Sequence, residues 1–372
     1  MKEWSSVLKN EELAVLELRR LYRERGYAQF KMSKFEEYEL YVRNKNFLVS
    51  DHVITFTDAG GKLMALKPDV TLSIVKNSKL QAGCVQRLYY DEKVYRASRT
   101  DHSFREIPQV GLECLGDIDD FAILEVLTLA AKSLACISED YVLDISHLGL
   151  LSALLDAMPL SDTAKDAIVS CIGEKNLHGI LKICEDEGIC AEQAEDLRAL
   201  VSTYGPAERV LPILEARFGK GEAAEALGQL RKLCRSLSEM LPAGCIRLDF
   251  SVVSDLNYYN GIVFKGFIKG IPSGILSGGQ YDKLMSRMGK RAGAVGFAVY
   301  LDLLEELYRK TGTGYDVDVL LLYSDADAPG TVQARIDALI GEGYTVSAQK
   351  SCPEKLKYRT LVRMNEKEGA KQ

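Results

Sequence analysis

The sequence predicts an α+β fold: an antiparallel sheet flanked by helices, with a helical insertion and a small C-terminal α/β unit. Paired β-rich segments occur on both sides of residues 147–241, and that interval has helical periodicity with almost no strand signal. A short alternation of strand and helix patterns follows residue 312. We therefore expect two parts of one core at residues 1–146 and 242–312, the insertion at 147–241 and the small unit at 313–372.

The chain opens with a predicted amphipathic helix over Glu11–Arg25. Apolar side chains recur there at helical spacing, and Gly26 follows where a left-handed residue ends a helix well. Next, the β-rich segments 53–57 and 62–66 flank Asp58-Ala59-Gly60-Gly61. Glycine reaches the positive φ angles of a tight reversal without strain, so a β-hairpin is expected here.

Two longer β-rich runs, Leu88–Arg96 and Phe104–Leu115, are separated by a polar connection. They predict an antiparallel pair of strands joined by a long loop. Asp117 is expected to cap a helix over residues 118–134, because an acid suits the positive N-terminal end of a helix. Residues 141–145 then return as a strand.

Beyond the insertion, strand patterns resume around a glycine-rich turn near residues 272–279. A strand–helix pair is expected over 294–309 and a further helix over 330–340. The remaining expected strands are 246–252, 261–268, 317–323 and 344–347.

Composition restricts the class of protein. With 372 residues, of which 47% are hydrophobic, the chain can form ordinary globular cores. The nine cysteines form no Cys-x-x-Cys pair and no cluster with histidine, so we expect reduced cysteines and no metal site. A net charge of −6 argues weakly against a surface that mainly binds a phosphate backbone.

No targeting or membrane-spanning segment is expected. An apolar run of the ~20 residues that cross a bilayer does not occur, and Met1–Asn10 lacks the apolar core of a signal peptide. The sequence therefore predicts a cytoplasmic protein.

Polar residues gather at two strand segments. Asp69 and Thr71 follow the predicted hairpin, and Gln109 and Glu113 lie on one face of a strand with Gly111 between them. The glycine leaves room for a small ligand beside these polar groups. The alternative is a solvated face, or an ion pair between Glu113 and an arginine, and these residues alone favour that alternative.

Other candidates are weaker when each is taken alone. Arg96 can bind a carboxylate bidentately, although a lone arginine is more typical of a surface ion pair. Tyr258 and Tyr259 can stack on a ring, but adjacent strand tyrosines usually divide between core and surface. Gly278–Asp282 permits close backbone approach or forms a plain turn. No nucleophile constellation surrounds a histidine, and no phosphate-binding glycine loop occurs.

Combined, these segments resemble the catalytic fold of class II histidyl-tRNA synthetases over about residues 10–310. The combination is more specific than any single motif. Lys67–Thr71 is similar to that family's Arg-Pro-Glu-Gly-Thr, Tyr95–Glu113 to its second class motif, Ser254–Phe264 to its histidine-specific block, and Gly278–Asp282 to its Gly-Gly-Arg-Tyr-Asp.

The departures from that family concern its nucleotide chemistry. Leu303 and Ser254 stand where the resemblance expects arginines that contact ATP phosphates and the reacting carboxylate, and Ala97-Ser98 replaces a His-Glu pair. Losing one group that stabilises transition-state charge typically costs about 10²–10³-fold in rate. We therefore expect no useful amino-acid activation.

Retained histidine contacts with lost ATP contacts resemble the regulatory subunits of ATP phosphoribosyltransferase. This resemblance implies a non-catalytic protein without a cofactor. It implies that the chain activates the short catalytic subunit, confers feedback inhibition by histidine, and forms homodimers within a hetero-octamer. The C-terminal unit resembles a truncated anticodon-binding domain, which argues against tRNA binding.

The resemblance also implies the roles of individual residues at a histidine site. It assigns Asp69, Thr71 and Gln109 to the amino group, Glu113 and Tyr259 to the ring, Tyr258 to the pocket wall and Arg96 to the carboxylate. Two other functions stay open: a divergent histidyl-tRNA synthetase, or a stand-alone module that binds histidine or a tRNA fragment.

Overall fold

A computed structural model describes residues 8–44, 53–98, 103–253, 258–304 and 315–364. The chain divides into two compact units, Met1–Glu306 and Leu307–Gln372, which are described separately. Ser254 and the last part of the predicted 294–309 pair lie outside the described residues.

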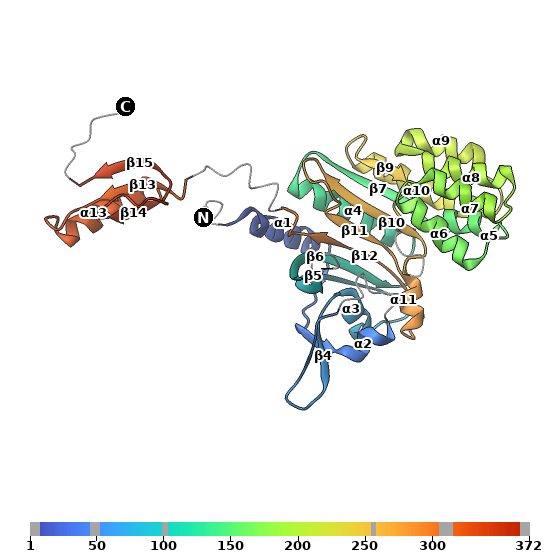
Figure 1. Ribbon diagram of the computed structural model, residues 1–372, viewed down its shortest axis with the longest axis horizontal. Helices are drawn as coiled ribbons and strands as arrows, with labels where there is room; N and C mark the ends of the chain where they lie inside the picture. Colours follow the sequence, from blue (N-terminus) through green and yellow to red (C-terminus); the bar gives the residue numbers. More distant parts are fainter. Residues whose placement is uncertain (1–7, 45–52, 99–102, 254–257, 305–314, 365–372) are drawn as a thin grey trace. The chain divides into compact units, whose positions relative to one another are not determined.

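The first unit is built on a nine-stranded sheet in the order β1-β5-β6-β12-β11-β10-β7-β9-β8 (Figure 1). Its strands are β1 Ala28–Gln29, β5 Val85–Ala97, β6 Phe104–Gly116, β7 Tyr141–His147, β8 Tyr204–Pro206, β9 Ile246–Asp249, β10 Ile262–Ile268, β11 Leu276–Gln280 and β12 Gly293–Tyr300. Within the described part of this sheet, β1 with β5 and β7 with β9 pair in parallel, and the other neighbours are antiparallel. The predicted α+β class is confirmed.

The predictions of the opening helix, the hairpin and the long strand pair are also confirmed. The opening helix is α1 (Asn10–Glu24), followed by Gly26 at φ +78°. In the hairpin, the Asp58 carboxylate accepts hydrogen bonds from the backbone N–H groups of Gly60 and Lys62, at 2.9 and 2.8 Å. Strands β5 and β6 pair in antiparallel register from Val85 opposite Gly116 to Ala97 opposite Phe104.

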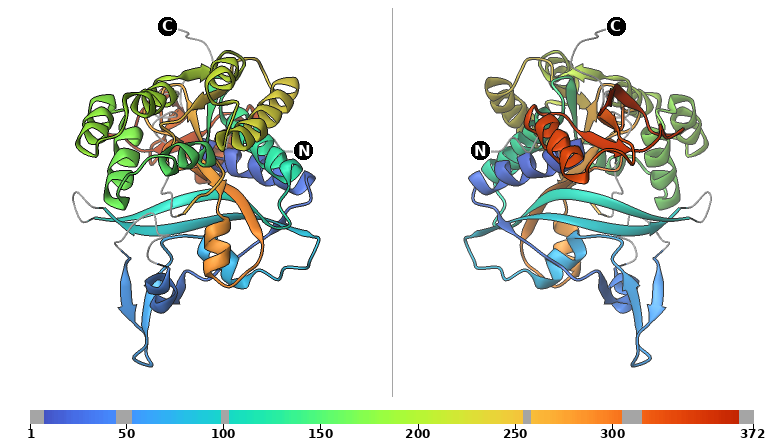
Figure 2. Two further views of the ribbon diagram at one scale, coloured as in Figure 1. Left: turned by 90° about the vertical axis from the view of Figure 1, so that its right-hand side faces the viewer. Right: turned by 90° about the vertical axis from the view of Figure 1, so that its left-hand side faces the viewer.

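The two faces of the sheet are covered differently (Figure 2). On one face α4 (Asp120–Ile137) packs against the sheet between α1 and α10 (Ala223–Met240). On the other face lie a three-stranded sheet and three short helices. These elements are β2 Phe35–Glu37, α2 Tyr38–Arg43, β3 Thr55–Thr57, β4 Leu63–Leu66, α3 Thr71–Asn77 and α11 Asp282–Arg287.

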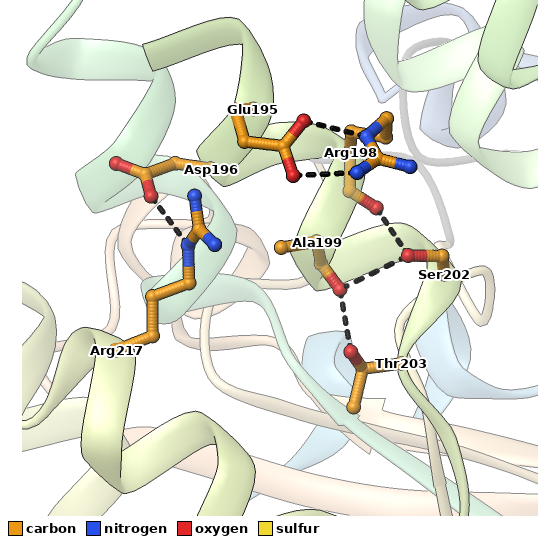
Figure 3. Close-up of polar contacts among 7 residues, drawn as sticks. All are labelled: Glu195, Asp196, Arg198, Ala199, Ser202, Thr203 and Arg217. Atoms are coloured by element: carbon orange, nitrogen blue, oxygen red, sulfur yellow. Dashed lines mark hydrogen bonds and ion pairs between the residues drawn. The ribbon is translucent and has the colours of Figure 1, made fainter. Parts of the chain in front are cut away.

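The predicted insertion is helical, with one strand that the sequence did not indicate. Its helices are α5 Leu148–Asp156, α6 Asp162–Gly173, α7 Leu177–Asp186, α8 Ala191–Ser202, α9 Ala207–Phe218 and α10. The short strand β8 pairs with β9, so the insertion extends the edge of the large sheet. Figure 3 shows the end of α8, where Ser202 and Thr203 donate to the carbonyl groups of Arg198 and Ala199, at 2.7 and 2.6 Å. The Ala199 carbonyl also accepts the backbone N–H of Thr203 at 3.1 Å, so the two hydroxyls reinforce the last turn of the helix.

Two local predictions were wrong. Helix α4 is capped by Asp119, whose carboxylate accepts from the backbone N–H of Ala122 at 2.8 Å, whereas the backbone N–H of Asp117 bonds to the carbonyl of Cys84. The glycine-rich segment near Gly278 is strand β11 and not a turn. A Cβ on Gly278 would lie 2.3 Å from the carbonyl oxygen of Gly296, so close approach of the neighbouring strand requires the glycine.

The second unit is a parallel sheet in the order β14-β13-β15 with one helix. Its elements are β13 Val317–Leu322, α13 Pro329–Gly341, β14 Val346–Gln349 and β15 Tyr358–Arg363. The sequence predicted all of these except β15, in which the adjacent pairs Arg359-Thr360 and Leu361-Val362 interrupt the polar–apolar alternation of a strand. Across the described parts of the chain, no helix combines the length and apolar character that crossing a bilayer requires.

Candidate ligand-binding site

Glu113 is the centre of a buried polar cluster. The cluster lies on the face of the large sheet that the small three-stranded sheet covers. The Glu113 side chain is 2% exposed. One carboxylate oxygen accepts from the hydroxyl of Thr71 at 2.8 Å, and the other from the phenol of Tyr281 at 2.5 Å. Residues from β6, α3 and the turn after β11 therefore meet at one carboxylate.

Burial controls the protonation of this group. It raises the pKa of Glu113 from 4.5 to about 8, because a carboxylate loses hydration inside the protein. The hydrogen bonds from Tyr281 and Thr71 oppose this shift, and the nearby charge of Asp69 adds to it. The carboxyl group can therefore gain or release a proton near neutral pH.

Two glycines leave room for neighbouring side chains, Gly296 for the Glu113 carboxylate and Gly111 for the Tyr90 ring. Gly296 lies directly opposite Glu113 on β12, and a Cβ there would lie 1.7 Å from a Glu113 oxygen. A Cβ on Gly111 would lie 2.5 Å from the phenol oxygen of Tyr90. Any larger residue would displace these side chains, so the glycines are required by close packing and not by a turn.

Asp69 lies in the turn that leads into α3. Its carboxylate accepts from the backbone N–H of Leu72 at 2.8 Å, which fixes the first turn of the helix and orients Thr71. Burial raises the pKa of Asp69, while the Leu72 N–H and the charge of Arg96 oppose that shift. The adjoining Lys67 is buried and pairs with Glu92 at 2.5 Å, so this basic residue is neutralised within the protein.

Arg96 is held beside the same turn. Its Nε donates to the carbonyl oxygen of Pro68 at 3.0 Å. Burial raises the pKa values of Asp69 and Tyr300, and the charge of Arg96 opposes both shifts. The guanidinium therefore lies at the border of the cluster, where it is tied to the backbone between Lys67 and Asp69.

Gln109 contributes an unsatisfied donor. Its side chain is 4% exposed, and in the described part of the chain its amide nitrogen has no hydrogen-bond partner. It lies two residues before Gly111 on β6, directly opposite Tyr300 of β12. A buried donor without a partner costs about 1–3 kcal/mol, so this position is suited to an acceptor on a bound molecule.

The aromatic residues form one wall of the cluster. The rings of Tyr258 and Tyr259 have centroids 4.4 Å apart, and Tyr258 and Tyr281 have centroids 5.9 Å apart. Burial raises the pKa of all three phenols, so they are neutral donors at physiological pH. Asn260 anchors the segment by a hydrogen bond of 2.9 Å to Asp282.

Four of the predicted site residues thus lie near Glu113: Asp69, Thr71, Tyr258 and Tyr259. Gln109 lies four residues away on the same strand, and Arg96 lies at the border. Sequence reasoning missed Tyr281, although it singled out the surrounding Gly278–Asp282 motif. That motif could have pointed to Tyr281, because the tyrosine directly follows strand β11 and its phenol reaches Glu113 on β6. Gln280, which stands where the similar motif has arginine, accepts from the backbone N–H of Ile262 at 2.9 Å.

Comparisons with known proteins identify the family of this chain. Residues 6–304 match the family model described as histidyl-tRNA synthetase. The ATP phosphoribosyltransferase regulatory subunit of Caldanaerobacter subterraneus subsp. tengcongensis is 29% identical over 289 residues, which cover 76% of this chain and 75% of that protein.

Two solved structures share the fold. A protein from Bacillus halodurans described as an ATP phosphoribosyltransferase regulatory subunit/histidyl-tRNA synthetase gives a TM-score of 0.75 at 22% identity, and 98% of this chain and 95% of that one are covered. A chain of the ATP phosphoribosyl transferase (HisG:HisZ) complex from Thermotoga maritima gives 0.61 at 19% identity, with 77% and 96% covered. The chain belongs to the histidyl-tRNA synthetase family, and several of its curated relatives are named ATP phosphoribosyltransferase regulatory subunits.

Proposed function

We propose that this chain is a non-catalytic regulatory subunit of ATP phosphoribosyltransferase that binds histidine at the Glu113 cluster. The name shared by its curated relatives supports the regulatory role. Activation of the short catalytic subunit and feedback inhibition by histidine are part of the same proposal. The chain would then act in histidine biosynthesis without catalysing a step itself.

The unsatisfied amide nitrogen of Gln109 is the observation that carries the ligand proposal. A buried donor of this kind is compensated when an acceptor such as a ligand carboxylate binds. The same amide has an oxygen that can accept from an ammonium group. One residue can therefore contact both ends of an amino acid's backbone.

The remaining groups suit the rest of a histidine molecule. Asp69 and the Thr71 hydroxyl offer acceptors for the ammonium group, and Arg96 is near enough to the cluster to balance the carboxylate. Glu113, with its pKa raised to about 8, can exchange a proton with an imidazole. Tyr259 and Tyr258 supply ring faces for stacking.

Chemistry on ATP is not part of the proposal. Leu303 is an aliphatic residue after β12, and Ala97 ends β5, so neither position supplies the charged side chain expected of an activating enzyme of this family. Gln280 is used to hold the Ile262 backbone. Adenylation needs preorganised cations at the phosphates and the reacting carboxylate, and these substitutions remove them.

Assembly and location remain predictions. We expect homodimers of this chain to join the short catalytic subunit in a hetero-octamer in the cytoplasm. If histidine prefers one arrangement of the assembly, and that arrangement alters the partner's active site, thermodynamic linkage requires a reciprocal effect. Substrate phosphoribosyl pyrophosphate should then weaken histidine binding.

Calorimetry with the purified chain, the short catalytic subunit and histidine tests the proposal. We expect histidine to bind, the two subunits to associate, and substrate to reduce the histidine affinity. Glu113→Ala combined with Tyr259→Phe should abolish feedback inhibition while activation of the partner persists. Equal loss of feedback inhibition and of activation would mean that these residues only maintain the fold. A histidine affinity that substrate does not change would contradict the proposed linkage.

The two other functions give different results. A divergent synthetase would exchange pyrophosphate into ATP in the presence of histidine, and we expect no such exchange. A stand-alone histidine-binding module would bind histidine but would not co-purify with the catalytic subunit.

A further inference from the structure

An apolar groove lies on the helical face of the first unit, on the opposite side of the sheet from Glu113. Its volume is about 290 Å³, and it is formed by α4, the last residue of α10 and the residue that follows α1. Its apolar lining includes Phe121, Leu124 and Met240. The groove is large enough for one or two side chains of a partner.

The exposure of this lining is unusual for α4. Most residues of the helix are buried, yet Phe121 is 62% exposed, and Met240 at the end of α10 is 50% exposed. Large apolar side chains that meet in a surface groove mark an interaction site more often than scattered ones do. Methionine also adapts its shape to a bound side chain.

The unpaired charges around the groove are positive. Within the described residues, the side chains of Arg25 and Lys132 make no ion pair or hydrogen bond. Glu125, the acid of the lining, is neutralised by Arg87 at 2.8 Å. A basic rim thus surrounds an apolar floor on a chain whose net charge is −6. The complementary partner carries an apolar side chain flanked by carboxylates.

A second groove, between α8 and α9, differs from the first in the pairing of its cation. Its volume is about 370 Å³, and Ile213 at its edge is 57% exposed. Its cation, Arg217, is already paired with Asp196 at 2.6 Å (Figure 3). That groove has similar size and exposure but no unpaired cation, so it serves as a control surface.

We propose that the α4–α10 groove docks the catalytic subunit through an acidic amphipathic segment with a large apolar anchor. This inference rests on the proposed function and names the surface that serves it. The anchor fills the space between Phe121 and Met240, and carboxylates on both sides pair with Arg25 and Lys132. An amphipathic helix in a groove is a common form of such recognition.

The test measures binding of the full-length chain to the short catalytic subunit by surface plasmon resonance. Phe121→Ser with Met240→Ser should raise the dissociation constant by about tenfold or more, mainly through faster dissociation, as expected for central apolar contacts. Arg25→Glu with Lys132→Glu should slow association and remove most of its dependence on salt. Ile213→Ser, in the control groove, should change neither rate.

The outcomes separate the two proposals. Wild-type binding that all three variants retain equally would overturn the docking surface and leave the proposed function intact. A wild-type chain that does not bind the catalytic subunit would overturn both. Thermal unfolding of each variant identifies a folding defect, and the charge-reversal pair, which changes only surface groups, still decides the question if the Phe121 variant unfolds.

Discussion

Tyr281 donates a hydrogen bond of 2.5 Å to Glu113 from a position 168 residues further along the chain. The helical insertion separates the two residues in sequence, and the pairing of β12 with both β6 and β11 brings their strands together. The bond joins the two halves of the core at the candidate site. The integrity of the site therefore depends on both halves of the sheet.

Removal of this bond should weaken the ligand site specifically. Tyr281→Phe deletes one hydrogen-bond donor to a buried carboxyl group, and a typical hydrogen bond contributes about 0.5–1.5 kcal/mol. We expect histidine affinity, measured by calorimetry, to fall by about two- to tenfold. Tyr22→Phe is the control, because its phenol bonds Ser133 at 2.9 Å elsewhere in the core. If both variants bind histidine like the wild type, Tyr281 has no role in the site.

The pH dependence of stability should reflect the raised pKa of Glu113. Its pKa is raised from 4.5 to about 8 in the folded chain. Between these values the folded chain keeps a proton that the unfolded chain has released, so stability falls as the pH rises through this window. Thermal unfolding from pH 5 to 8.5 should show this decline in the wild type and a smaller one in Glu113→Gln. Parallel curves would contradict the assignment.

Gln109 should carry a stability cost that the ligand relieves. Gln109→Met replaces the buried amide, whose nitrogen has no partner in the described structure, with an apolar chain of similar size. We expect the free protein to gain about 1 kcal/mol or more. Histidine should no longer raise the melting temperature. A variant that is less stable than the wild type would show that the amide already has a partner, such as ordered water.

Gly296 should tolerate no side chain while Glu113 is present. Gly296→Ala places a Cβ 1.7 Å from the Glu113 oxygen, and such overpacking typically costs about 1–3 kcal/mol. Denaturant unfolding should show this loss, together with loss of histidine binding. Adding Glu113→Ala should recover part of the stability but not the binding. Gly228→Ala, inside α10 with open space around it, is the matched control and should stabilise the chain slightly.

Local structure was predicted well where one segment contains the whole signal. The spacing in Glu11–Arg25 predicted α1, and Gly60-Gly61 marked the hairpin because few residues reach a positive φ there. The errors lie where distant segments decide. Gly278 was placed in a turn because its neighbouring strand cannot be recognised from local sequence. Strand β8 was missed because its three residues, Tyr204–Pro206, carry no local strand pattern and form a strand by pairing with β9.

The sequence by itself determined the alternation of strands and helices, the place of the insertion and the family to which the motifs belong, since periodicity and turn chemistry are local properties. The tertiary structure alone decided that Tyr281 completes the Glu113 cluster, that Gln109 is buried with an unpaired donor, and that Arg25 and Lys132 flank an apolar groove. The burial of a side chain and its hydrogen-bond partners depend on which distant segments meet. These contacts determine how much hydration each polar group loses and thereby shift its pKa.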